Sequence, residues 1–324
     1  MELDEFLTEW NNDSDRVLVH TSGSTGRPKP MWVEKKRMRA SARTTCAFLG
    51  LKHGDTALLC MPLDYIAGKM VVVRALECGL KLVDVKPSGH PLSTLTDAPV
   101  FAAMVPMQVY NSMRVPRERE LLMRIRHLII GGGAVDADME RELRGFPNAV
   151  WSTYGMTETL SHVALRRLSG PEADTWYMPF GGVEVGRASD GCLEIFAPAI
   201  CADRLKTNDI VEFADDKRRF RILGRKDNVI CSGGIKIQIE EVERVLRPHL
   251  DAPFILTKRP DPKFGYSAVL LTEATGIDSV SSVCREVLPA YWQPKHYVHV
   301  NRIPLTATGK PARAEAERIA AGED

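Results

Sequence analysis

Short apolar runs alternate with helical patterns over roughly the first half of this 324-residue chain. Runs of four to six apolar residues are typical of buried strands, and apolar residues three or four apart are typical of helices. A strand, then a helix, then another strand is the order of βαβ units, which build a mainly parallel sheet. We expect strands at 16–20, 56–61, 81–85, 100–105, 127–130 and 149–152, and helices at 31–49, 67–78, 107–113 and 136–144.

The pattern changes after Phe180 to short strands, expected at 192–197, 210–213 and 219–223. A polar stretch at 224–227 follows, and beyond it a smaller α/β unit begins. That unit has a helical apolar stripe over 239–246, strands at 254–257 and 267–272, and a polar tail at 312–324 that predicts a helix or a frayed end. The predicted fold is α/β, with a large N-terminal domain at 1–226 and a small C-terminal α/β domain at 227–324. The large domain combines a mainly parallel sheet, flanking helices and a short β-rich part.

Charge and composition exclude several classes of protein. Lys and Arg total 43 against 42 Asp and Glu, so a nucleic-acid-binding face is not expected. The acidic start lacks a signal-peptide pattern, and no apolar run approaches the roughly 18 residues of a membrane span. The seven cysteines are dispersed without zinc spacing, which is typical of reduced thiols in a cytosol. We therefore expect a cytoplasmic protein that binds neither membrane nor nucleic acid.

A loop rich in hydroxyl groups and glycine follows the first predicted strand. It is not a Walker A loop, because its two glycines are too close together and Pro30 follows the lysine. Its glycines let the backbone approach an anion, its hydroxyls can donate, and its lysine brings a positive charge. The loop predicts a phosphate site, although a Ser/Gly-rich surface turn is the alternative. The residues concerned are Thr21, Ser22, Gly23, Ser24, Thr25, Gly26 and Lys29.

A second motif, Ser152-Thr153-Tyr154-Gly155-Met156-Thr157-Glu158-Thr159, follows another predicted strand. Tyr154 can stack on a base, and Thr157 can donate to a phosphate. The carboxylate of Glu158 is a hard oxygen ligand of the kind that Mg²⁺ prefers. The alternative for Glu158 is a carboxylate that stabilises a helix start.

These two motifs and three further stretches occur in an order that resembles the adenylate-forming (AMP-binding) superfamily. That superfamily includes acyl-CoA synthetases, peptide-synthetase adenylation domains and luciferases. The resemblance runs from about Val17 to Arg313. The further stretches are GGGA at 131–134, TNDIVEF at 207–213, and GRKDNVICSGGIKI at 224–237 taken together with PLTATGK at 304–310.

The resemblance implies ATP and CoA as substrates and Mg²⁺ as the metal. A carboxylate would attack the α-phosphorus of ATP, and CoA would then attack the acyl adenylate. Lys310 matches the lysine that bridges carboxylate and phosphate, with Thr157 and Glu158 as the other catalytic residues; a solvated lysine is the alternative for Lys310. The small domain would swing between the two half-reactions about Asp227. Nucleotide contacts are implied for Gly132, Gly133, Ala134, Tyr154, Gly155, Asp209 and Arg225, and a pantetheine tunnel for Gly233 and Gly234, which a plain turn would equally explain.

Two features depart from the family pattern. Only 20 residues precede Thr21, where the family has a long segment, so we expect a compact variant. An edge left exposed by that loss would suit a homodimer. The stretch 61–68 matches the family segment that gates the acyl site, but Tyr65 replaces the usual histidine and would not carry a titrating charge.

Within the superfamily, the text around Glu158 resembles the o-succinylbenzoate–CoA ligases of menaquinone biosynthesis. Their substrate is an aromatic dicarboxylate, whose spare carboxylate needs donors. Beside the gate residue Tyr65, the candidates are Lys69, Thr159, Ser161 and His162. A helix-surface lysine is the alternative for Lys69, and a packed core histidine for His162. Another aryl- or acyl-CoA ligase, an amino-acid adenylation enzyme and a non-catalytic nucleotide-binding module stay open. His296 and His299 are expected to be structural, because residues three apart on a strand face opposite sides.

Overall fold

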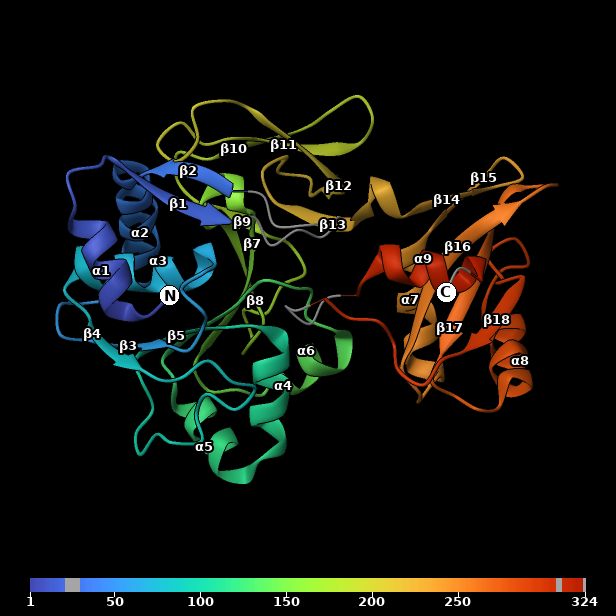
Figure 1. Cartoon of the computed structure of the whole chain (residues 1–324), viewed down its shortest axis with the longest axis horizontal. Coiled ribbons are helices and arrows are strands. Elements are labelled where there is room, and N and C mark those ends of the chain that lie inside the picture. Colours follow the sequence, from blue (N-terminus) through green and yellow to red (C-terminus); the bar gives the residue numbers. More distant parts are fainter. Residues whose placement is uncertain (21–29, 307–310, 323–324) are drawn as a thin grey trace.

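The fold is that of a computed structural model, which describes residues 1–20, 30–306 and 311–322. Figure 1 shows a larger body that holds the helices and strands up to β13 (Phe220–Arg225), and a smaller body that holds those from β14 (Val229–Ser232) onward. The buried apolar clusters divide in the same way, between Phe220 and Ile230. This division brackets the predicted domain boundary, although the boundary residue itself stays a prediction.

A mainly parallel sheet forms the centre of the larger body. In the described part of the chain it has seven strands in the order β4-β3-β5-β6-β7-β8-β9. The first five strands run parallel, and the last two are antiparallel to their neighbours. The predicted fold class is therefore confirmed. The strands are β3 (Thr56–Leu59), β4 (Lys81–Asp84), β5 (Phe101–Met104), β6 (His127–Ile130), β7 (Ala149–Gly155), β8 (His162–Arg167) and β9 (Met178–Pro179).

Helices cover both faces of this sheet (Figure 1). One apolar cluster joins the sheet to α1, α2 and α3, and a separate cluster joins it to α4, α5 and α6. The helices are α1 (Leu3–Asn11), α2 (Lys35–Leu49), α3 (Ile66–Cys78), α4 (Pro106–Arg114), α5 (Pro116–Arg124) and α6 (Ala137–Leu143). The sequence did not predict α1 or α5.

The strand that precedes the predicted phosphate loop lies outside the parallel sheet. β1 (Arg16–His20) forms an antiparallel pair with β2 (Pro30–Glu34), so the helix expected from residue 31 begins only at Lys35. The expectation was wrong for four residues, because pairing with β1 overrides the helical apolar spacing of 31–34. The last residue of β1, His20, also pairs through its backbone with Tyr65.

A four-stranded antiparallel sheet follows the parallel one and corresponds to the predicted β-rich part. Its longest strand, β12, carries Asp209, and the strand paired with it ends at Arg225. The strands are β10 (Glu184–Arg187), β11 (Cys192–Phe196), β12 (Leu205–Phe213) and β13 (Phe220–Arg225).

In its described residues, the smaller body packs three α-helices against a five-stranded sheet. Gly233 and Gly234, with φ +57° and +83°, form the two-residue turn between β14 and β15. Two positive φ angles in a two-residue hairpin loop are the pattern of a type I′ turn, which favours glycine. No helix in the described ranges is long and apolar enough to span a membrane. The elements are β14 (Val229–Ser232), β15 (Ile235–Gln238), α7 (Ile239–Leu246), β16 (Phe254–Asp261), β17 (Gly265–Thr272), α8 (Ile277–Val287), β18 (His296–His299) and α9 (Arg313–Ala321).

Candidate active site

The carboxyl ends of four adjacent parallel strands, β3, β5, β6 and β7, meet at one edge of the large sheet. Ligands of open α/β sheets bind at this edge. The predicted gate follows β3, the GGGA stretch follows β6, and the second motif occupies the end of β7 and the turn beyond it. The fold therefore brings together three of the stretches that the sequence singled out.

The GGGA stretch lies close against its neighbours. A Cβ on Gly131 would overlap Thr153 Oγ1 on the adjacent strand. Gly132 has φ +77°, which side chains rarely adopt, and its missing Cβ faces Val105. Glycine is thus required for the backbone path here, whether or not adenine lies against it.

A tight turn joins β7 to β8 and positions Ser161. A Cβ on Gly155 would overlap the carbonyl oxygen of Ser161, and Leu160 has the positive φ of 61° that is uncommon outside glycine. Thr159 is fully buried, and its hydroxyl accepts from Met156 N at 3.0 Å and lies 2.7 Å from Ser161 O. The Thr159 hydroxyl is therefore satisfied within the turn, and its predicted contact with substrate stays a prediction.

Behind Ser161 lies a buried arginine that the sequence did not single out. Arg74, on α3, is 2% exposed, and its Nη2 donates to Ser161 Oγ at 2.5 Å. Its Nε has no hydrogen-bond partner in the described ranges, and no described carboxylate pairs with the guanidinium. Burial lowers the pKa of Arg74 to about 10, so it stays charged at neutral pH. Among the described residues, the candidate site thus has a positive charge behind Ser161 that no carboxylate neutralises.

Ser161 continues a chain of hydrogen bonds into the protein. Ser161 Oγ lies 3.2 Å from His162 Nδ1, and Thr45 Oγ1 lies 3.0 Å from His162 Nε2 and 3.2 Å from Ser41 O. A guanidinium can only donate, so Ser161 accepts from Arg74 and has its own proton free for Nδ1. We infer that His162 carries its proton on Nε2 and donates to Thr45, which donates to Ser41 O.

This orientation requires a neutral imidazole. Burial, and then the charge of Arg74, lowers the pKa of His162 well below its ordinary value. The sequence left open whether His162 is a substrate contact or a packed histidine. The structure buries it, at 6% exposed, one hydrogen bond behind Ser161.

A second cluster joins β7 to the four-stranded sheet. Tyr154 OH donates to Asp209 Oδ2 at 2.6 Å, and Arg225 Nη1 donates to Asp209 Oδ1 at 3.2 Å. Burial, and then Asp209, raises the pKa of Tyr154, so the phenol stays a donor. The Tyr154 ring is itself buried and meets Phe220 edge to face, so its stacking on a base stays a prediction. Each Asp209 oxygen keeps a lone pair free, as a ribose contact needs.

The predicted hinge is held by polar contacts on both sides. Asp227 accepts from Arg225 Nη2 at 2.8 Å and from Asn208 Nδ2 at 3.0 Å. Lys226 Nζ lies 2.8 Å from Asp190 Oδ2, and Asn228 donates to Glu240 of α7. Burial by itself would lower the pKa of Arg225, but the carboxylates of Asp227 and Asp209 raise it. These contacts link the four-stranded sheet to the smaller body.

The described residues do not by themselves supply a full set of protein ligands for magnesium. Among the described residues no group of three or more His, Cys, Asp or Glu side chains could hold a metal ion. Mg²⁺ that accompanies a nucleotide commonly needs one or two carboxylates and takes its other ligands from phosphates and water. Glu158, exposed at the start of the short 3₁₀ helix 157–159, fits that requirement, with the buried Thr157 beside it.

A sequence profile described as "AMP-binding enzyme" matches residues 5–185 of the chain. The chain belongs to this family. The 2-succinylbenzoate–CoA ligase of Bacillus licheniformis is 26% identical over 333 residues, which cover 93% of this chain and 69% of that protein. The crystal structure of an acyl-CoA synthetase (AMP-forming)/AMP-acid ligase II-like protein from Dyadobacter fermentans shares 33% identity and covers 96% of this chain and 91% of that chain, with a TM-score of 0.65.

The fold is also that of the O-succinylbenzoate coenzyme A synthetase of Bacillus subtilis, solved with ATP and magnesium ion. That structure is 22% identical, has a TM-score of 0.75, and is matched over 92% of this chain and 69% of its own. The family and these ligase relatives together identify this AMP-binding enzyme as an AMP-forming ligase.

Several predicted site residues lie apart from these clusters or outside the described residues. Residues 21–29 and Lys310 lie outside the residues that the structure describes. Lys69 is only 1% exposed and pairs with Glu9 of α1 at 3.0 Å, so it is not the surface lysine of the alternative reading. A substrate carboxylate that used Lys69 would have to compete with Glu9. Gly233 and Gly234 are explained by their turn, and their role in a CoA tunnel stays a prediction.

Sequence reasoning missed Arg74 and Leu160. A signal for Arg74 was present, because it stands in an otherwise apolar helical stretch, Met70-Val71-Val72-Val73-Arg74-Ala75-Leu76. A charged residue within such a stretch indicates either that the helical register has been assigned wrongly or that the charge has a function. Leu160 had no such signal, since its backbone angle depends on the turn that surrounds it.

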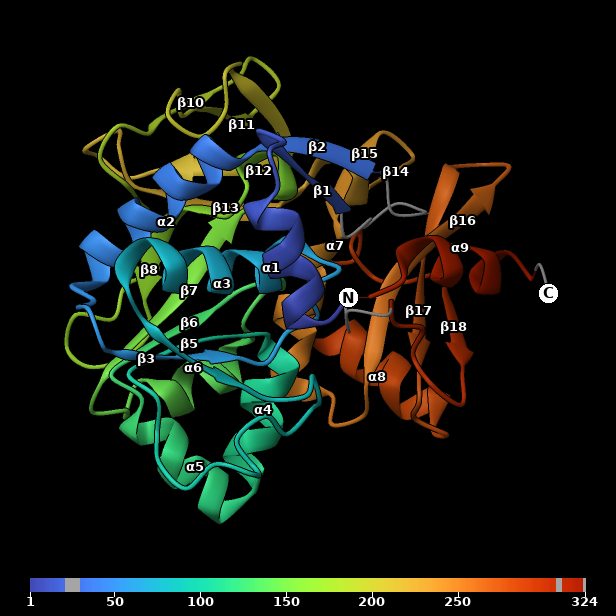
Figure 2. The same ribbon diagram turned by 60° about the vertical axis from the view of Figure 1, so that its left-hand side comes forward.

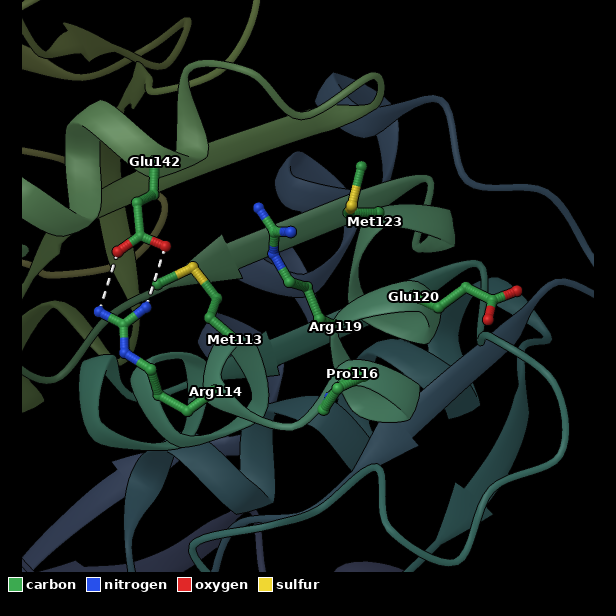
Figure 3. A pocket seen from close by; sticks show the side chains of 7 residues that line it. All are labelled: Met113, Arg114, Pro116, Arg119, Glu120, Met123 and Glu142. Carbon is green, nitrogen blue, oxygen red and sulfur yellow. Dashed lines mark hydrogen bonds and ion pairs between the residues drawn. The ribbon is translucent and has the colours of Figure 1, made fainter.

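An open groove of about 590 Å³ lies between α4, α5 and α6, and Figure 3 shows its lining. Arg114 and Glu142 face each other across it in a double hydrogen bond of 2.9 and 3.0 Å. None of the predicted site residues lines it. We assign it no function.

Proposed function

We propose that this chain is an ATP- and Mg²⁺-dependent acid–CoA ligase whose substrate is an aromatic acid with a second carboxylate, o-succinylbenzoate being the best candidate. The observation that carries the substrate class is Arg74. A buried charge without a counter-ion costs several kcal/mol, and an anionic ligand would offset that cost. Because the guanidinium lies directly behind half-buried Ser161, its charge acts on the site that Ser161 lines.

The reaction would proceed in two steps. A carboxylate oxygen of the acid attacks the α-phosphorus of ATP and expels pyrophosphate, which leaves an acyl adenylate. The thiolate of CoA then attacks the acyl carbon and expels AMP. Bound Mg²⁺ would reduce the charge of the phosphates, with Glu158 as its protein ligand. Asp209 and Arg225 would hold the ribose, and Lys310 would neutralise the approaching anions in the first step.

The 2-succinylbenzoate–CoA ligase relatives support this substrate at about a quarter sequence identity. Another aryl- or acyl-CoA ligase is the nearest alternative and would differ only in the acid. An amino-acid adenylation enzyme would pass its acyl group to a carrier protein instead of CoA. A non-catalytic nucleotide-binding module would have no use for Lys310.

The deciding experiment is ATP–pyrophosphate exchange with o-succinylbenzoate, followed by thioester formation with CoA. A matched acid without the second carboxylate, such as benzoate, is the control. Exchange with no aromatic acid would contradict the enzyme proposal. Exchange only with acids that lack the second carboxylate would contradict the substrate proposal.

Arg74→Met tests the observation directly. Loss of a charged hydrogen-bond partner is worth about 1.5–3 kcal/mol, so KM for the dicarboxylate should rise about 10- to 100-fold. KM for ATP should change little, and Arg74→Lys should recover part of the loss because it restores the charge. A thermal melt of each variant separates this effect from unfolding. An equal loss with benzoate and with the dicarboxylate would show that Arg74 does not recognise the second carboxylate.

A further inference from the structure

Glu9, on α1, joins two elements that lie far apart in the sequence. Its Oε1 accepts from the backbone N–H of Leu18 in β1 at 3.1 Å. Its Oε2 accepts from Lys69 Nζ in the first turn of α3 at 3.0 Å. One carboxylate thus uses one oxygen for each element. Figure 2 shows α1 beside α3 and near β1.

The two elements also meet at a second point. His20, which ends β1, pairs with Tyr65, the residue before α3. Lys69 N donates to Tyr65 O at 3.3 Å, so Lys69 lies one helical turn beyond Tyr65. The contacts therefore close a ring from Glu9 through Leu18, His20, Tyr65 and Lys69 back to Glu9.

Burial makes this ring sensitive to Glu9. Lys69 is 1% exposed, its ammonium lies 4.8 Å from the Phe6 ring centre, and Glu9 is the carboxylate that pairs with it. The Glu9 side chain is 22% exposed, but its loss would leave the buried Lys69 ammonium without its carboxylate, which is far more costly than replacement of both groups by apolar ones. Glutamine cannot replace Glu9, because both carboxylate oxygens of Glu9 accept a hydrogen bond. In glutamine an amide nitrogen, which is a donor, would face either the Leu18 N–H or the Lys69 ammonium.

We infer that Glu9 is a positioning residue. It holds the end of β1 and the first turn of α3 in a fixed position relative to each other. α1 thereby couples the strand that leads into residues 21–29 to Tyr65, the predicted gate of the acyl site. Its effect on catalysis rests on the proposed function, but its effect on the two elements does not.

Three variants test this inference. Glu9→Gln removes the negative charge opposite Lys69 and leaves one acceptor oxygen for two donors, whereas Glu9→Leu/Lys69→Met removes both charges and conserves volume. Asp4→Asn is the control, because it makes the same charge change on an exposed position of the same helix. Backbone hydrogen exchange over 16–20 and 62–70 requires no substrate. It should become faster in the first two variants and stay unchanged in Asp4→Asn.

Kinetics then separate positioning from stability. Glu9→Gln should lower the melting temperature and reduce kcat/KM of pyrophosphate exchange about 10- to 100-fold, as for a displaced binding group. The double variant should recover the melting temperature but not kcat/KM. If the double variant regains wild-type kcat/KM, the pair is only structural and the inference fails.

Two further outcomes are decisive. If a variant does not fold, Glu9→Asp replaces it, because the shorter side chain cannot reach both partners and should show the same pattern in weaker form. If the wild-type protein shows no ATP–pyrophosphate exchange with any acid, the proposed function fails. The hydrogen-exchange result then tests the role of Glu9 independently of catalysis. Unchanged backbone hydrogen exchange in Glu9→Gln would overturn the inference.

Discussion

At the scale of single residues, the candidate site combines groups whose charge state is set by burial. Arg74 keeps its charge without a described carboxylate, and His162 beside Ser161 is held neutral. The two facts are linked, because an imidazolium next to a buried guanidinium would add a second unpaired positive charge. The hydrogen-bond direction from Arg74 to Ser41 depends on that neutral state.

The neutral state of His162 predicts a pH dependence of stability. Its folded-state pKa lies well below the ordinary 6.5, so as pH falls through 6.5 the unfolded chain takes up a proton that the folded chain does not. The free energy of unfolding therefore decreases as the pH drops below about 6.5. The total decrease is about 1.4 kcal/mol for each unit by which the folded-state pKa lies below the unfolded-state pKa. Denaturant unfolding from pH 8 to 5 measures this.

His162→Gln is the comparison for that measurement. It should be less stable than wild type at pH 8, because one or more buried hydrogen bonds are lost at about 1–3 kcal/mol. The difference between the two proteins should shrink toward pH 5. A constant difference across the range would contradict a neutral His162.

At the scale of elements, the site depends on how the turn after β7 is built. Gly155 allows β8 to approach β7, the Thr159 hydroxyl accepts a hydrogen bond from Met156 N, and Leu160 has a positive φ of 61°. Such conformations persist only where surrounding packing holds them. Here they place Ser161 between Arg74 and His162.

Gly155→Ala should therefore affect the site and the stability together. The new Cβ would overlap the Ser161 carbonyl, and such overpacking costs about 1–3 kcal/mol. KM for the acid should rise, because Ser161 and Arg74 can no longer keep their contact. Gly181→Ala is the matched control, since a Cβ there meets nothing within 4 Å. Equal effects from both variants, measured by melting and by exchange kinetics, would contradict this account.

At the scale of the whole molecule, the two bodies are linked through the contacts of Arg225, Lys226, Asp227 and Asn228. The predicted pivot thus lies among residues that touch both bodies. Within the smaller body, Arg313 anchors the start of α9 to Glu243 of α7 through hydrogen bonds of 2.7 and 2.9 Å. A homodimer and the swing of the small domain stay predictions.

Lys310→Ala tests the division of work between the two half-reactions. Adenylation should fall about 100- to 1,000-fold, because one positive charge that cancels the approach of two anions is lost. Thioester formation from supplied acyl adenylate should be largely intact. Lys263→Ala, which removes one exposed charge from the same part of the chain, should leave both steps unchanged. Equal loss of both steps in Lys310→Ala would contradict the assigned role.

The sequence by itself determined the α/β class, the order of most strands and the family, because periodicity and short motifs are local properties of the chain. It also singled out three stretches that follow strands whose carboxyl ends share one edge of the sheet, and their role as the active site stays a prediction. It could not determine the pairing of β1 with β2, which replaces four helical residues by a strand. Nor could it determine the partners of Arg74 and Lys69. Those depend on which side chains from distant elements fill the same buried space, and only the tertiary structure decides whether a buried charge meets a carboxylate, as Lys69 meets Glu9, or a serine, as Arg74 meets Ser161.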